Sequence, residues 1–297
     1  MGINSCEAQA ILALKRQDAV GSEMLCLGRP ELFVSAKQAA RFARDFGFAG
    51  AEAAAVAATR ETFAEPFLNA FGFNDVRSLD ASAYEGASLI HDLNTLIPLD
   101  LEATTDFLYD GGTMEHVFDV ATVFKNIAKL LKVGGTTLIS TAANGQCGHG
   151  FYQYSPELFY RVLEANGFED VRVYLVGLQP PERWVLAVDP KAAKRRVQFL
   201  TSEPTQLIAI AKKARTLDAF VVPQQSDYAD GVWTMEQGQI AAAHGEWSSA
   251  KSRARALVRD RLAYPAAVAM RAAGASRIPG LWRRELFRPI DPARDGV

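Results

Sequence analysis

Cysteine is scarce in this chain. Its three copies, Cys6, Cys26 and Cys147, are odd in number and lie far apart in the sequence. That pattern argues against a disulfide framework and against a zinc site built from cysteines. Long apolar runs are also missing, since no segment approaches the length of a membrane-spanning helix. The N-terminus, MGINSCEAQA, has no basic-then-apolar signal pattern, so we expect a reducing, cytoplasmic environment.

Motifs that define several other enzyme classes are absent as well. The sequence contains no G-x-x-x-x-G-K-[ST] phosphate loop and no G-x-S-x-G nucleophile elbow. The G-x-G-x-x-G fingerprint does not follow the first predicted strand, so the sequence gives little support to an oxidoreductase with a nicotinamide cofactor. No close spacing of cysteine and histidine suits zinc, so we expect no metal site. The sequence carries no strong signal for nucleic-acid binding either.

The composition is that of an ordinary globular protein, because 49% of the 297 residues are hydrophobic and 22% are charged. Residues 251–297 contain eleven Lys and Arg against four Asp and Glu, about +7, which leaves about −9 of the net −2 for the first 250 residues. We therefore predict an α/β domain over residues 1–215 and a basic, largely helical C-terminal extension over residues 216–297. A solvated helical face is one interpretation of this charge. Contact with an acidic partner, an anionic surface or a phosphate-bearing substrate is the other.

The segment from Asp106 to Ser140 predicts one strand-helix-strand unit. A short apolar run at residues 107–109 is typical of a buried parallel strand, and it ends at Asp110-Gly111-Gly112. Apolar residues then recur at helical spacing, at Val120, Val123, Phe124, Ile127, Leu130 and Leu131. Gly134-Gly135 ends the helix, and residues 136–141 predict the next strand. The two strands should be parallel, with a right-handed crossover.

The remaining strands are predicted by other apolar runs, at residues 24–27, 76–80, 171–176 and 207–211, and residues 88–94 predict a third strand with the loop that follows it. Helical sequence at residues 36–46 and 49–64 is longer than one crossover needs, so we place an insertion between the first two strands. Prolines at 180, 181 and 190 predict a hairpin insertion before the last strand. Strands that alternate with helices predict an α/β fold with a doubly wound, mostly parallel sheet.

The central segment resembles the fourth and fifth strands of class I S-adenosylmethionine (SAM)-dependent methyltransferases. The matching pieces are Asp106, residues 114–117 (Met-Glu-His-Val) and residues 131–135 (Leu-Lys-Val-Gly-Gly), with Val133 where proline is usual. The resemblance covers roughly residues 20–215. It implies a seven-stranded Rossmann-like sheet, with the seventh strand inserted antiparallel between the fifth and the sixth, and SAM as the cofactor.

The resemblance also implies a set of cofactor-binding residues at the ends of successive strands. They are Gly28, Asp80, Asp92, Leu93, Asp110 and Gly111. An acid at the end of the second strand can accept hydrogen bonds from both ribose hydroxyls, although an ordinary Asx turn at Asp80 is the alternative. Asp92 would accept from the adenine amino group, and Leu93 would offer its backbone.

The glycine-rich loop departs from the family pattern, since it reads Gly28-Arg29-Pro30 and keeps one glycine. Arginine adds bulk and proline removes an N–H group, whereas glycine lets the backbone approach a ligand closely. The competing interpretation is therefore that this loop is a degenerate strand-to-helix turn that no longer binds a ligand.

Two histidines are the candidates for removing a proton from a methyl acceptor. His116 lies just beyond the fourth strand, and His149 lies in the glycine-rich loop beyond the fifth, so both should face one mouth. Glu115 would orient a histidine or the substrate, and Tyr152 and Gln153 are predicted substrate contacts because they flank His149. The alternatives are that His116 caps the following helix and that His149 braces its own loop.

Two hypotheses follow from these patterns. The first is SAM-dependent methyl transfer to a small-molecule or sugar-like, glycan-related acceptor. The second is a catalytically inactive, methyltransferase-like binding or assembly module whose basic tail docks a partner.

Overall fold

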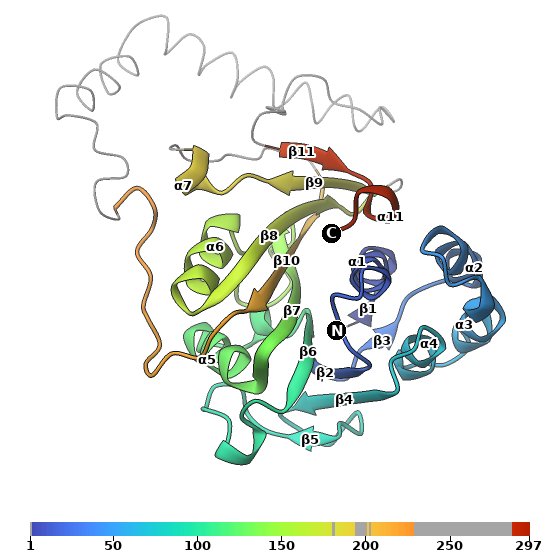
Figure 1. Cartoon of the computed structure of the whole chain (residues 1–297), viewed down its shortest axis with the longest axis horizontal. Helices are drawn as coiled ribbons and strands as arrows, with labels where there is room; N and C mark the ends of the chain where they lie inside the picture. Colours follow the sequence, from blue (N-terminus) through green and yellow to red (C-terminus); the bar gives the residue numbers. More distant parts are fainter. Residues whose placement is uncertain (1, 180–181, 194–200, 202, 229–286) are drawn as a thin grey trace, which may run out of the picture.

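A large mixed sheet forms the centre of the molecule in the computed structural model of the chain (Figure 1). The structure describes residues 2–179, 182–193, 201, 203–228 and 287–297. Within them, nine strands form this sheet in the order β11-β9-β8-β10-β7-β6-β2-β4-β5. A second, two-stranded sheet pairs β1 (Gly2–Ile3) with β3 (Glu31–Leu32) in parallel.

Five parallel strands form one half of the large sheet. They are β2 (Glu23–Leu27), β4 (Asp75–Asp80), β5 (Leu89–Ile90), β6 (Thr105–Gly111) and β7 (Leu131–Asn144). β2 lies at the centre, paired in parallel with β4 on one side and β6 on the other. The chain therefore changes direction across the sheet at β2 and β6, which is the place where open α/β sheets bind ligands.

The other half is antiparallel. β10 (Thr205–Lys213) lies between β7 and β8 (Phe168–Gly177) and runs antiparallel to both. β9 (Arg183–Ala187) forms the predicted hairpin with β8, and β11 (Phe287–Ile290) pairs with β9 at the edge. The predicted count of seven strands is wrong, because this hairpin and the C-terminal strand extend the sheet by two.

The remaining seven strands have the predicted class I methyltransferase order, 3-2-1-4-5-7-6, with the seventh antiparallel. The predicted α/β class is therefore confirmed from strand order and direction. The third strand is short, since only Leu89 and Ile90 pair with β4, and the rest of residues 88–94 lies outside the strand.

Helices cover both faces of the sheet (Figure 1). One face carries α1 (Ser5–Arg16), α2 (Ala36–Asp45), α3 (Glu52–Ala58) and α4 (Glu65–Ala70), whose apolar residues form one core cluster. The other face carries α5 (Val120–Leu130) and α6 (Pro156–Ala165), which pack into a second cluster. Shorter helical turns are η1 (Ala49–Ala51), η2 (Leu99–Leu101), η3 (Met114–His116), α7 (Pro190–Ala193) and α11 (Pro292–Asp295). The predicted insertion between the first two strands consists of β3 and α2 to α4.

Helix starts follow local sequence signals. Asn4 and Glu7 form a capping box at α1, and Ser35 and Gln38 form another at α2. α5 begins after Asp119, whose carboxylate accepts from the backbone N–H of Thr122. Ser155 precedes α6, but its side chain makes no capping hydrogen bond.

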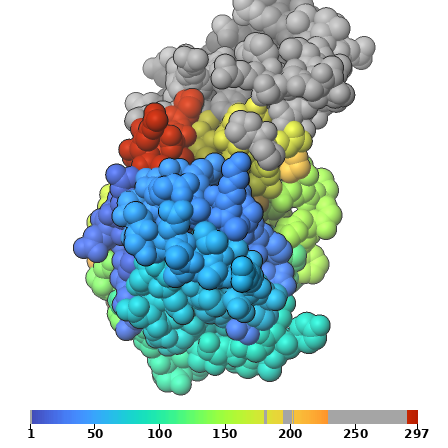
Figure 2. Space-filling view, turned by 90° about the vertical axis from the view of Figure 1, so that its right-hand side faces the viewer, coloured from blue at the N-terminus to red at the C-terminus, as the bar shows by residue number. Residues whose placement is uncertain are grey.

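The last residues of the chain return to the main domain. Figure 2 shows residues 287–297 (red) packed beside the N-terminal helices (blue), and Arg16 donates to the carbonyl of Ala293 at 2.7 Å. The basic stretch from Lys251 to Arg271 lies outside the described residues. The boundary at residue 215, the partner of the tail and a cytoplasmic location stay predictions. In the described part of the chain, every helix is too short or too polar to cross a bilayer.

Phe107 tests the energetics of the central strand. Its side chain is fully buried in β6 and stacks on Phe73 at a ring distance of 5.9 Å. We expect Phe107→Ala to lower the free energy of unfolding by about 3–5 kcal/mol, because a large core side chain leaves a cavity. Phe118→Ala, at a 72% exposed position, should change it by only about 0.5 kcal/mol. Equal losses in urea denaturation would contradict this view of the core.

Candidate active site

The polar groups of interest lie where the parallel strands end. The loops after β2, β4, β6 and β7 all leave the same edge of the sheet, because parallel strands share one carboxyl end. The predicted nucleoside-binding residues come from the first two of these loops and from the segment after β5. The predicted catalytic residues come from the other two.

The predicted nucleoside-binding residues make local contacts. Gly28 has a positive φ of 73° and donates to the carbonyl of Leu79 at 2.7 Å. Asp80 accepts from the backbone N–H of Ser82 at 3.0 Å, which is the Asx-turn alternative. Asp92 accepts from both the backbone and the side chain of Asn94, and these bonds lower the pKa of Asp92. Leu93 is buried in the core, so its side chain is unavailable to a ligand.

Arg29 links the two loops between which the nucleoside would lie. Its guanidinium pairs with Glu65 at 2.6 Å and donates to the carbonyl of Glu85 at 2.7 Å. It also covers the ring of Phe63 at 3.8 Å. Since Glu85 belongs to the loop after β4, this side chain ties the end of β2 to the end of β4.

Asp110 organises the turn after β6. Its fully buried carboxylate accepts from the backbone N–H of Thr113 at 2.7 Å and of Met114 at 3.2 Å. Burial, and then repulsion by Glu115, raise the pKa of Asp110 to about 7. At the next residue, Gly111, a Cβ atom would lie 2.4 Å from the hydroxyl of Tyr109, so only glycine fits. The contacts that Asp110 and Gly111 make in the structure stabilise the turn after β6. Their contacts with a cofactor stay predictions.

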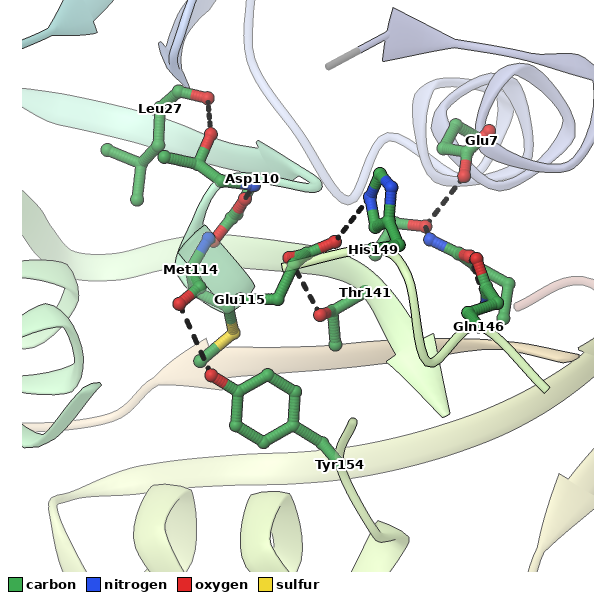
Figure 3. Close-up of polar contacts among 12 residues, drawn as sticks. Glu7, Leu27, Asp110, Met114, Glu115, Thr141, Gln146, His149 and Tyr154 are labelled. Atoms are coloured by element: carbon green, nitrogen blue, oxygen red, sulfur yellow. Dashed lines mark hydrogen bonds and ion pairs between the residues drawn. The ribbon is translucent and has the colours of Figure 1, made fainter. Parts of the chain in front are cut away.

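Glu115, His116 and His149 come together at the mouth of this edge, as expected from their strand positions. Figure 3 shows Glu115 and His149 facing each other. Glu115 is fully buried, and its Oε1 atom lies 3.3 Å from Nε2 of His149. The two imidazole rings pack edge to face at 4.9 Å. Burial is the main cause that lowers the pKa of His116. Both histidines are exposed, so solvent or a ligand can reach them.

The supports of Glu115 are also fixed. The hydroxyl of Thr141 on β7 donates to its Oε2 atom at 2.8 Å (Figure 3). The N–H of Phe151 donates to the Glu115 carbonyl at 2.7 Å, which ties the loop of His149 to η3. Gly150 permits this approach, since its φ is 75° and a Cβ there would lie 2.7 Å from the same carbonyl. The carboxylate and His149 are thus held together by backbone as well as side-chain contacts.

The predicted substrate contacts brace the loop in this structure. The Tyr152 hydroxyl donates to the backbone carbonyl of Phe118 at 2.8 Å. The side-chain amide oxygen of Gln153 accepts from the backbone N–H of Gln146 at 3.0 Å. Phe118 and Phe151 meet edge to face at 6.1 Å, and both are mostly exposed beside the histidines. The mouth therefore has an apolar aromatic rim around a polar centre.

A third buried carboxylate near this edge, besides Asp110 and Glu115, was missed from the sequence. Glu7 of α1 (Figure 3) accepts from the hydroxyl of Ser140 at 2.7 Å, and Ser140 accepts in turn from the side chain of Gln206. Burial raises the pKa of Glu7. The available signal was the capping pattern of Asn4 and Glu7, which predicts the helix start but not a contact 133 residues away in sequence.

Two cavities among the described residues have linings that contain none of Glu115, His116 and His149. One, of about 630 Å³, is lined by residues of α1, α2, β9 and α11, including Gln9 and Trp184. The other, of about 500 Å³, lies by the C-terminal end of α5 and includes Lys125 and Lys213. Neither contains the residues predicted to bind the cofactor.

The cluster of Glu115, His116 and His149 can assist a reaction in two ways. A neutral imidazole oriented by a carboxylate can accept a proton from a bound hydroxyl or amine. Alternatively, two imidazoles and one carboxylate can hold a cation that polarises a bound oxygen. Both ways act on a group delivered from solvent to the mouth of the sheet.

Solved structures similar to this chain are SAM-dependent methyltransferases. The trans-methyltransferase CalH in complex with SAH is 14% identical, with 69% of this chain and 55% of that chain covered and a TM-score of 0.34. The 1,6-didemethyltoxoflavin-N1-methyltransferase of Burkholderia thailandensis, with bound 1,6-didemethyltoxoflavin and S-adenosylhomocysteine, is 18% identical (70% and 79% covered, TM-score 0.36). A SAM-dependent methyltransferase from Archaeoglobus fulgidus is 11% identical (69% and 94% covered, TM-score 0.36).

This chain thus spans about half the length of CalH. No protein-family model matches the sequence, and no curated protein matches it. Similarities at this level assign no substrate and no activity. The fold rests on strand order and direction, as described above.

Asp110 should make stability depend on pH. Its pKa is about 7 in the folded state and about 4 in an unfolded chain, so the folded state binds the proton more tightly between these values. The free energy of unfolding should therefore fall as pH rises from about 5 to 7, by on the order of 1 kcal/mol per pH unit. Asp110→Asn should reduce this slope in urea denaturation, leaving the part that buried Glu7 contributes, whereas the exposed Asp45→Asn should keep it. An unchanged slope in Asp110→Asn would contradict the assignment.

Proposed function

We propose that the protein transfers the methyl group of SAM to a small-molecule acceptor at the carboxyl edge of its sheet. The observation that carries this proposal is the class I strand order with a buried carboxylate and two exposed histidines at the mouth. Methyl transfer needs an acceptor held in line with the sulfonium and, where the acceptor is a hydroxyl or amine, loss of its proton. The cluster stands where that proton would leave.

SAM would occupy the ends of β2 and β4. Asp80 would accept from the ribose hydroxyls, and Asp92 with the backbone of Leu93 would contact the adenine. Gly28, Asp110 and Gly111 would line the approach of the methionine part. Arg29 would first leave its present contacts with Glu65 and the Glu85 carbonyl, which are 2.6 Å and 2.7 Å long.

The acceptor would lie over the loops after β6 and β7. His149 and His116 would act on its reacting group, with Glu115 as the buried anchor. Tyr152 and Gln153 flank this position, and the exposed rings of Phe118 and Phe151 offer an apolar surface. Such a rim suits a flat or sugar-like acceptor, because aromatic rings pack against both. A glycan-related acceptor therefore stays within the proposal.

A specific observation also favours the non-catalytic alternative. Arg29 joins the loops after β2 and β4, between which SAM would lie, with one ion pair and one hydrogen bond. If the bridge is permanent, the fold serves as a binding or assembly module without SAM. Displacement of Arg29 is what separates the two functions.

Cofactor binding gives the first test. We expect calorimetry to show S-adenosylhomocysteine binding in the micromolar range, and Asp80→Ala to weaken it about tenfold, since two ribose hydrogen bonds to a carboxylate are lost. The control is Asp75→Ala at the opposite end of β4, which should leave affinity unchanged. If the folded wild-type protein and the Arg29 variant both fail to bind, methyl transfer is the wrong function.

Arg29 gives the second test. Arg29→Ala should raise the affinity for S-adenosylhomocysteine roughly 3- to 10-fold, because the ligand no longer breaks a partly buried ion pair worth on the order of 1 kcal/mol. Arg44→Ala is the matched control, since Arg44 pairs with Glu52 at the same 2.6 Å but on the surface of α2. A weaker affinity in Arg29→Ala would mean that Arg29 holds the ligand rather than blocking it.

A further inference from the structure

The spacing of three side chains at the mouth points to a metal ion. The candidate ligand atoms of Glu115, His116 and His149 all lie within 4.8 Å of one another, and Oε1 of Glu115 is 3.3 Å from Nε2 of His149. Ligand atoms that share one ion at about 2.1 Å stand roughly 3–3.5 Å apart. One pair already has this spacing. Rotation of the two exposed imidazoles would bring the other pairs of ligand atoms to the same spacing.

Within the residues that the structure describes, few hydrogen bonds and no full positive charge offset the burial of the Glu115 carboxylate, and a cation would supply that charge. Oε1 of Glu115 is buried and receives no hydrogen bond, while Oε2 receives one from Thr141. A second buried acid, Asp110, is close enough to repel it. Burying an ionised carboxylate is costly unless a positive charge or hydrogen bonds offset it. The free oxygen faces His149, on the side where the two imidazoles stand.

The surroundings also match those of a bound metal. The Thr141 hydroxyl fixes one carboxylate oxygen and leaves the other free, which is how outer groups orient metal ligands. The hydrogen bond from the Phe151 N–H to the Glu115 carbonyl, and the close approach at Gly150, hold the His149 loop against η3. The ligands are therefore preorganised across 34 residues of sequence, from Glu115 to His149. Close-spaced ligand motifs, on which the expectation of no metal rested, do not detect such a set.

We propose that Glu115, His116 and His149 bind one divalent transition-metal ion. Two imidazole nitrogens and one carboxylate oxygen suit Zn²⁺, Co²⁺, Mn²⁺ or Fe²⁺ rather than Ca²⁺, which prefers oxygen ligands. The exposed side of the cluster leaves coordination positions for a ligand from solvent.

The role of the ion rests on the proposed function. A hydroxyl of the acceptor bound to the ion would lose its proton to solvent more readily than in water. An oxygen lone pair then forms the O–CH₃ bond, the C–S electron pair returns to sulfur, and SAM becomes S-adenosylhomocysteine. Glu115, His116 and His149 would hold the ion and so fix the direction from which the oxygen attacks.

Metal titration of the full-length, chelator-stripped protein tests the site without any activity assay. We expect Co²⁺ to bind one to one with micromolar affinity and visible absorption, and Zn²⁺ to displace it. Glu115→Gln, His116→Ala and His149→Ala should each weaken binding at least tenfold, as loss of one ligand of three requires. His91→Ala, an exposed histidine held to the Thr95 carbonyl, should bind as the wild type does.

Cys147 needs a separate control because it is an exposed thiol two residues before His149. Cys147→Ser should keep the one-to-one binding. Binding that is lost in Cys147→Ser, or that is unchanged in Glu115→Gln and His149→Ala, would overturn the proposed ligand set. Circular dichroism of each variant guards against loss of fold.

Calorimetry with S-adenosylhomocysteine separates the two proposals. Metal binding without nucleoside binding would support the ion site and reject the methyltransferase function. Nucleoside binding without metal binding at up to millimolar Co²⁺ would reject the ion site and leave proton removal to an imidazole. His149→Ala should keep the wild-type affinity for S-adenosylhomocysteine, because His149 is assigned to the acceptor side.

Discussion

The parallel pairing of β2 with β4 and β6 is the constraint on which the rest of the structure depends. It sends the loops after these strands, and the loop after β7, to one edge. The backbone N–H and C=O groups of the strands bond to neighbouring strands, so the sheet is a rigid scaffold. The loops at its edge can then carry functional polar side chains. Helices on both faces bury the apolar side chains of the strands, which leaves this edge as the place where polar groups gather. The candidate site is a consequence of that arrangement.

The side chains at two parts of this edge differ in how far their present contacts leave them able to bind a ligand. At the predicted acceptor side, Glu115 is fixed by the Thr141 hydroxyl and by backbone contacts to the His149 loop. At the predicted cofactor side, Arg29 joins the loops after β2 and β4, and the acids Asp80 and Asp92 are engaged in local turns. In the proposed function, these local contacts have to rearrange for a nucleoside, whereas the two exposed histidines are already accessible to a ligand. This asymmetry makes the metal and nucleoside experiments informative independently of each other.

Much of the architecture could be predicted from the sequence. Apolar runs located the strands, and helical spacing from Val120 to Leu130 gave α5. The order of the strands came from the resemblance and is confirmed by pairing. The count failed because β11 pairs with β9 across about a hundred residues, and no local pattern encodes a pairing over that distance. The point within residues 88–94 at which the third strand ends was not predicted, and the turn at Asp92 follows it closely.

The sequence by itself determined which residue types stand at each strand end, because apolar periodicity and turn residues are local properties. It therefore placed His116 and His149 near one mouth. Only the tertiary structure decided what those residues touch: that Glu115 is buried with one free oxygen facing His149, that Glu7 reaches Ser140, and that Arg29 binds Glu65 and the Glu85 carbonyl. Contacts of this kind depend on the packing of segments distant in the chain, and burial sets their charge and hydrogen-bonding demands.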